Sequence, residues 1–89
     1  MRFIALVKFR KQVTRESVVE SLRKQVLEAK EGIRYQGIYW TLGRYDVVAI
    51  FEAADATAAM NMSIRRGDDF EMETLVAVPA EEARKLVTP

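Results

Sequence analysis

The sequence contains no cysteine and no histidine among its 89 residues. The absence of cysteine excludes disulfides and thiolate nucleophiles, and the absence of both residue types excludes the usual protein ligands of zinc. Every catalytic triad that uses histidine as its base is excluded as well. The common histidine and cysteine ligands of haem iron are also missing, so we expect neither a bound metal nor another cofactor.

Long apolar runs and an excess of one charge are missing too. The first apolar segment ends at Lys8. It is too short for a membrane span and has no small-residue cleavage site, so we expect a cytoplasmic protein. Fourteen Lys and Arg residues nearly balance thirteen Asp and Glu residues, at a formal charge of +1. Because the two signs are interspersed, we expect no binding to nucleic acid and none to membranes.

What is present is the composition of a small folded domain. Hydrophobic residues make up 49% of the chain and charged residues 30%. This apolar content is too high for a disordered chain. Because a chain of this length cannot bury two separate cores, we interpret residues 1–89 as a single domain.

Hydrophobic periodicity and turn residues predict four strands and three helices. The strands are expected at residues 2–9, 33–42, 46–53 and 70–78. The first helix is expected to be capped by Thr14 and to run to about Lys30, and the second to span 56–66 with Asp55 as its cap. A short last helix is expected at 80–87. The order is therefore β-α-β-β-α-β followed by a helix.

The helical spacing also predicts which side chains are buried. In the first helix the buried face is expected to carry Val18, Val19, Leu22, Val26 and Ala29. The opposite face, which includes Glu28, is expected to be solvated. The apolar stripe of the second helix is expected to consist of Ala56, Ala59, Met60, Ser63 and Ile64. Met62 lies off this stripe, so we expect its side chain to be partly exposed or at an interface.

Two split β-α-β units with right-handed crossovers form an α+β fold. The predicted sheet is antiparallel, has four strands in the order 4-1-3-2, and carries both long helices on one face. Its other face lacks a cover, yet Ile4 and Leu6 are apolar on the side of the first strand opposite to Phe3 and Val7. The last helix spans only about 12 Å and cannot cover four strands. We therefore expect a homodimer in which two sheets face each other, or a higher homo-oligomer built from such dimers.

The hairpin between the second and third strands resembles that of the GYD-domain family. The family is named for a glycine, a tyrosine and an aspartate, which are found here as Gly43, Tyr45 and Asp46. Its later pattern is similar to residues 73–75 followed by Pro79, so the resemblance covers nearly the whole chain. The resemblance implies a ferredoxin-like domain whose sheets pair as a dimeric α/β barrel. It implies no settled activity.

The turn at residues 43–46 is explained in part by its structural role. Gly43 can adopt a positive φ, and the carboxylate of Asp46 can accept hydrogen bonds from backbone N–H groups of the turn. Arg44 and Tyr45 have no such explanation. A guanidinium that can bind carboxylate or phosphate, and a ring with a polar tip, both suit the rim of a pocket.

Charged residues inside the predicted strands indicate a second feature. Because the first and fourth strands are antiparallel neighbours, Lys8 and Glu73 are expected to lie near each other at the hairpin end of the dimer-facing side. One interpretation is a partly buried ion pair that fixes the strand register. The other is that Lys8, Glu73, Tyr39, Arg44 and Tyr45 bind a small anionic or zwitterionic ligand.

Three functions are compatible with the sequence. The first is a homo-oligomer that binds a small metabolite at the subunit interface. The second is a structural or partner-binding oligomer with a solid interior and no ligand. The third is a cofactor-independent enzyme, whose acid-base groups would have to be Glu, Asp, Lys or Tyr because histidine and cysteine are missing. The sequence assigns no catalytic residue.

Overall fold

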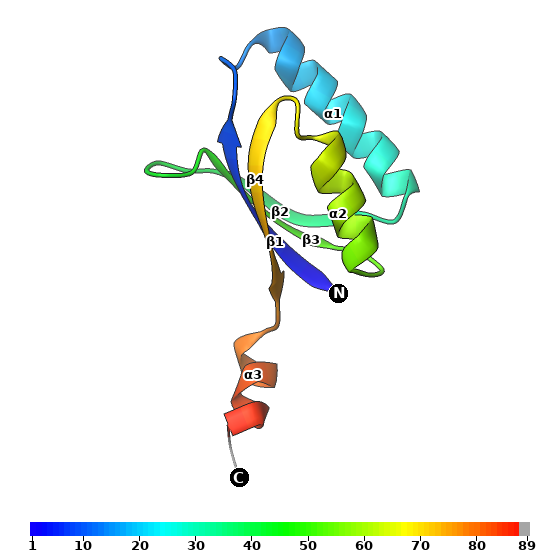
Figure 1. Cartoon of the computed structure of the whole chain (residues 1–89), viewed down its shortest axis with the longest axis vertical. Coiled ribbons are helices and arrows are strands. Elements are labelled where there is room, and N and C mark those ends of the chain that lie inside the picture. The colour runs from blue at the N-terminus through cyan, green and yellow to red at the C-terminus, as the bar shows by residue number, and fades with distance from the viewer. Residues whose placement is uncertain (88–89) are drawn as a thin grey trace.

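The computed structural model describes residues 1–87 as an antiparallel sheet with two helices on one face and a third helix that projects away (Figure 1). The elements are β1 (Arg2–Phe9), α1 (Arg15–Lys30), β2 (Arg34–Trp40), β3 (Val47–Glu52), α2 (Ala56–Arg65), β4 (Phe70–Ala77) and α3 (Ala80–Val87). The predicted order of strands and helices is confirmed, with small differences at the ends of the elements.

The sheet has the strand order β2-β3-β1-β4, and each neighbouring pair is antiparallel. This is the predicted order 4-1-3-2 read from the other edge. Both α1 and α2 lie on the same face of the sheet (Figure 1). The α+β, ferredoxin-like arrangement is therefore confirmed.

The second strand is shorter than the predicted range 33–42 because the chain turns at both of its ends. The N–H of Ile33 donates to the carbonyl of Glu28 at 3.0 Å, so Ile33 closes the end of α1. The N–H of Thr41 donates to the carbonyl of Asp46 at 2.9 Å, and the Thr41 hydroxyl donates to the carbonyl of Tyr45 at 2.7 Å. Both bonds stabilise turns that flank the strand.

Both predicted helix N-caps are confirmed. The Thr14 hydroxyl accepts from the N–H of Ser17 at 3.1 Å, and the Ser17 hydroxyl accepts from the N–H of Thr14 at 2.8 Å, which completes a capping box. The Asp55 carboxylate accepts from the N–H of Ala58 at 2.8 Å. These bonds satisfy backbone donors that have no partner within the helix.

The hydrophobic core lies between the sheet and α2. Phe3 of β1 stands opposite Phe51 of β3, and their rings stack with centroids 5.3 Å apart. From α2, Ala59 and Met62 are buried against these strands. In α1, by contrast, the one buried residue is Glu28. The two helices therefore contribute to the core in very different ways.

The prediction for Met62 is wrong. Its side chain is only 1% exposed and is part of the core, whereas Met60 and Ile64 of the predicted stripe are exposed. The hydroxyls of Ser63 and Thr74 lie 2.9 Å apart and form a hydrogen bond between α2 and β4. This bond helps to hold α2 in a rotation that turns Met62 toward the sheet.

The predicted faces of α1 are also wrong in part. Val19 and Val26, which were expected to be buried, are exposed, and Glu28, which was expected to be solvated, is only 3% exposed. The reason is an ion pair that helical periodicity does not reveal, between Glu28 and Arg66 at the end of α2. It turns a polar side of α1 toward the protein interior.

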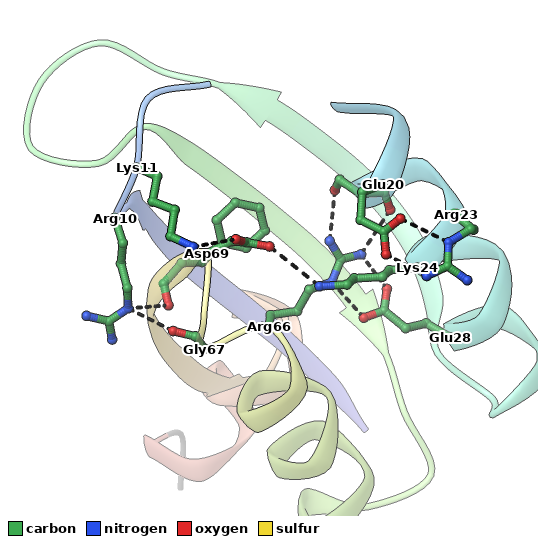
Figure 2. Close-up of polar contacts among 11 residues, drawn as sticks. Arg10, Lys11, Glu20, Arg23, Lys24, Glu28, Arg66, Gly67 and Asp69 are labelled. Atoms are coloured by element: carbon green, nitrogen blue, oxygen red, sulfur yellow. Dashed lines mark hydrogen bonds and ion pairs between the residues drawn. The ribbon is translucent and has the colours of Figure 1, made fainter. Parts of the chain in front are cut away.

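The Glu28–Arg66 pair is bidentate and fully hydrogen-bonded (Figure 2). The Arg66 guanidinium donates from Nε to Glu28 Oε2 at 2.9 Å and from Nη2 to Glu28 Oε1 at 2.7 Å. It also donates to the hydroxyl of Ser21 at 2.8 Å, and the Tyr35 hydroxyl donates to Glu28 Oε1 at 2.9 Å. Burial disfavours the charge of Arg66, but the Glu28 carboxylate still holds the pKa of the guanidinium above its ordinary value. Burial and the same carboxylate raise the pKa of the Tyr35 phenol.

Helix α3 continues from β4 away from the sheet (Figure 1). Its apolar side chains Leu86 and Val87 are exposed. The helix therefore leaves uncovered the face of the sheet that lies opposite to α1 and α2.

We expect Arg66→Met to lower the free energy of unfolding by about 3–5 kcal/mol, because it leaves the Glu28 carboxylate buried without its partner. Urea unfolding followed by circular dichroism at a fixed protein concentration measures the change. Adding Glu28→Gln to this variant should recover part of the loss, since the unpaired charge is removed while Tyr35 keeps an acceptor. Arg65→Met is the matched control, because Arg65 pairs with Glu31 at the exposed surface and should change stability very little. A loss in Arg66→Met no larger than in the control would contradict the expectation.

Candidate functional site

The sheet face opposite to α1 and α2, which we call the open face, carries an apolar strip. In the strand register Ile4 stands between Ile50 and Leu75, and Leu6 stands opposite Val48. These five side chains are therefore neighbours across three strands. The sequence prediction that Ile4 and Leu6 point away from the helices is confirmed by this register.

A hollow of about 260 Å³ lies at the hairpin end of the open face. Its walls come from β1, from β4 and from the loop between β2 and β3. The lining residues are Leu6, Lys8, Arg44, Tyr45, Glu71, Met72 and Glu73. Four of the five residues predicted to bind a ligand are therefore brought together.

Tyr45 and Glu73 connect the two sides of this hollow. The Tyr45 hydroxyl donates a hydrogen bond to Glu73 Oε2 at 3.0 Å. Because β1 lies between β3 and β4, the Tyr45 side chain must cross β1 to make this bond. The bond to Glu73 raises the pKa of the Tyr45 phenol above its ordinary value, and partial burial and the carboxylate charge act in the same direction. At neutral pH Tyr45 is therefore a hydrogen-bond donor rather than a general base.

The charges around the hollow are balanced. Lys8 and Arg44 supply two cations, and Glu71 and Glu73 supply two carboxylates. Lys8 stands directly opposite Glu71 in the register of β1 and β4. Such a surface presents partners for both an anionic and a cationic group of one small molecule.

One of the two interpretations of these residues, a partly buried ion pair between Lys8 and Glu73, does not agree with the structure. Both residues are exposed, and the register places Glu73 opposite Leu6 rather than opposite Lys8. The carboxylate of Glu73 accepts from Tyr45 instead. Among residues 1–87 no ion pair joins Lys8 to Glu73.

Tyr39 lies outside the hollow. It belongs to β2 at the edge of the sheet and stands opposite Val48. Its ring packs back along its own strand, so that a Cβ atom added at Gly37 would lie 2.7 Å from Tyr39 Cε2. The glycine at this position leaves room for the Tyr39 ring. The structure therefore separates Tyr39 from the other four predicted residues.

Gly43 and Asp46 have different structural roles in the turn. Gly43 has a φ of +104°, a conformation that residues with a side chain rarely adopt. Asp46 Oδ2 accepts from the N–H of Phe9 at 2.8 Å, and the N–H of Asp46 donates to the carbonyl of Val7 at 2.8 Å. The carboxylate of Asp46 thus binds the end of β1, where the sequence predicted a bond within its own turn.

Glu71 was not among the residues predicted to bind a ligand. Strand alternation places it on the same face as Glu73, because residues two apart on a strand share a face. The buried cluster of Glu28 and Arg66 was missed as well. It had no such local signal, since its members are far apart in the sequence.

Residues 1–87, the described part of the chain, contain neither a metal-binding cluster nor a membrane-spanning helix. No group of three or more acidic side chains there is arranged to hold a metal ion. None of the helices there combines the length and the apolar character that crossing a bilayer requires.

A family model described as the GYD domain matches residues 3–87. The matched segment includes every residue that lines the hollow. No curated protein and no solved structure matches the chain significantly.

We expect Glu73→Gln to lower the pKa of the Tyr45 phenol toward its ordinary value, because the negative acceptor of its hydrogen bond is removed. The phenolate absorbance of each protein, minus that of the same protein with Tyr45→Phe, isolates this titration. Since the raised pKa belongs to the folded state, the bond stabilises the fold below the pKa of an unfolded tyrosine, about 10, and this contribution is lost as pH rises through the folded value. Glu71→Gln is the matched control and should leave the titration unchanged. An equal shift in both variants would contradict the assignment.

Proposed function

The chain belongs to the GYD domain family, and we propose that it acts as a homodimer that binds a small zwitterionic metabolite where its two sheets meet. The observation that carries this proposal is the charge-balanced hollow at one end of an uncovered apolar face. The apolar strip supports association, and the hollow supports ligand binding.

The uncovered strip favours a dimer; it consists of Ile4, Leu6, Val48, Ile50 and Leu75. Both large helices lie on the other face, and α3 projects away (Figure 1). Monomeric proteins rarely leave a continuous apolar patch of this kind in contact with water. A second copy offers the same strip in return, and a two-fold axis lets the two strips cover each other.

The balance of charge in the hollow favours a zwitterionic ligand. Arg44 can bind a carboxylate through two parallel hydrogen bonds, with Lys8 as a second cation. Glu71 and Glu73 can accept hydrogen bonds from an ammonium group. A purely anionic ligand would be repelled by the two carboxylates beside it. An α-amino acid, or a molecule with the same two groups, matches all four side chains.

The dimer and the site support each other. In one chain the hollow is open to solvent, where charge interactions are weak. A second sheet laid over the open face would exclude water from the hollow and strengthen each polar contact to the ligand. Ligand binding would in turn favour the dimer, because the two equilibria are linked.

We expect the protein to sediment as a dimer at micromolar concentration, and Ile50→Lys to weaken the dimer by about a hundredfold or more, since it places an unpaired charge between the sheets. Analytical ultracentrifugation over a dilution series measures both. Val26→Lys introduces the same charge on the exposed side of α1 and should leave association unchanged. A monomeric wild-type protein, or equal effects of the two variants, would refute the proposed dimer.

We expect a panel of amino acids at millimolar concentration to include at least one that raises the melting temperature, with a shift that grows with ligand concentration. Combined Lys8→Met and Arg44→Met should abolish the shift. Lys11→Met is the control, because Lys11 pairs with Asp69 away from the hollow. If the double variant keeps the full shift, the ligand binds elsewhere; if no amino acid or other zwitterion shifts the wild-type protein, the proposed ligand class is wrong.

A further inference from the structure

A second cavity, of about 180 Å³, lies on the other side of the sheet, between α1 and the strands. Ala5 and Val7 of β1 and Ala49 of β3 line its sheet side. Val18 and Leu22 of α1 line its helix side. The cavity therefore extends from the surface to the middle strands of the sheet.

The cavity exists because α1 is fixed by polar contacts rather than by apolar packing. Arg66 holds Glu28 and Ser21 of α1, as Figure 2 shows for Glu28. The apolar side chains Val18 and Leu22 on the same helix remain 40% and 55% exposed. At Val18 and Leu22, α1 lies over the cavity but its side chains do not fill it.

The cavity is open to a small molecule at its rim. Besides Val18 and Leu22, the rim includes Trp40 of β2, whose side chain is 65% exposed although it lines the cavity. Three apolar side chains that contact both solvent and cavity form an entrance. No backbone movement is required for access through it.

The charged groups in the cavity wall are already paired. Arg66 is neutralised by Glu28, and Lys24 Nζ lies 3.5 Å from Asp69 Oδ2 (Figure 2). The rest of the lining is uncharged. A charged ligand would have to compete with one of these pairs or lose its own hydration without compensation. The wall therefore favours a ligand without charge.

Aromatic rings dominate one side of the cavity. The ring of Phe9 lies 5.3 Å from that of Trp40 and 5.8 Å from that of Phe70, at tilted angles of 58° and 45°. Tilted ring pairs at such distances are favourable, and a further ring can join them in the same manner. An apolar cavity of about 150 Å³ is known to be large enough for benzene.

We propose that the cavity between α1 and the sheet binds a small, uncharged aromatic molecule of one ring. This site is separate from the hollow on the open face, which lies on the opposite side of the sheet and carries balanced charges. One chain thus has a polar site and an apolar site that differ in the class of ligand they take.

Titration of the isotope-labelled protein with toluene and with p-cresol, followed by amide NMR, tests the proposal. We expect saturable shifts at Ala5, Ala49 and neighbouring lining residues, with a dissociation constant of millimolar order or lower. Benzoate has a ring of the same size and a negative charge, and it should bind about tenfold more weakly or not at all. The Trp40 fluorescence should change with the same constant, since the chain has one tryptophan.

Two variants reduce the volume of the cavity, one at its floor and one at its rim. Ala49→Leu fills the floor of the cavity, and Val18→Phe blocks its rim at an exposed position that does not endanger folding. Each should weaken toluene binding by about tenfold or more. Ala29→Leu adds the same side chain as the first variant at an exposed position on α1, outside the cavity, and should leave binding unchanged. If circular dichroism shows that Ala49→Leu is unfolded, Val18→Phe decides.

Four results would overturn the proposal. The first is the absence of saturable shifts in the wild-type protein up to the solubility of both neutral probes. The second is binding of benzoate as tight as that of toluene, and the third is wild-type affinity in a folded Ala49→Leu and in Val18→Phe. The fourth is a shift of the amides of Val18 and Leu22, on the side of the sheet away from the open face, when the protein alone is diluted, which would show that a second copy occupies the cavity.

Discussion

The buried pair of Glu28 and Arg66 is the interaction on which the rest of the structure depends. A bidentate pair with further bonds to Ser21 and Tyr35 has all its polar atoms satisfied, so each helix must keep the rotation that preserves it. For α1 this rotation turns polar side chains inward. For α2 it agrees with the burial of Met62. The pair thus decides which side chains form the core.

The fold leaves apolar surface on both sides of the sheet, for a different reason on each side. On the helix side α1 is held by polar contacts, which leaves a cavity beneath Val18 and Leu22. On the other side none of the helices in residues 1–87 covers the sheet (Figure 1). An empty apolar cavity destabilises a fold roughly in proportion to its volume. A small domain has little stability to lose in this way, so both surfaces are where binding would stabilise it most.

Sequence patterns correctly predicted the features that depend on residue type, on spacing and on the pairing of strands. The caps Thr14 and Asp55 and the strand order follow from residue types and spacing, and the grouping of Lys8, Arg44, Tyr45 and Glu73 follows from antiparallel pairing. The burial of Glu28 could not be predicted, because its partner Arg66 is 38 positions away and periodicity assigns a charged side chain to solvent. The bond from Phe9 to Asp46 was missed for the same reason, since the two residues meet only when β1 and β3 pair.

The strand register keeps the polar hollow and the apolar cavity distinct. Side chains alternate along β1, so Leu6 lines the hollow while Ala5 and Val7 line the cavity. A shift by one residue would exchange these faces and place Lys8 against the helices. Two bonds oppose such a shift at the hairpin end: Asp46 holds the N–H of Phe9, and Tyr45 crosses β1 to reach Glu73. The turn that characterises the family is therefore more than a connection between strands, because it holds β1 in the one register that separates the two surfaces.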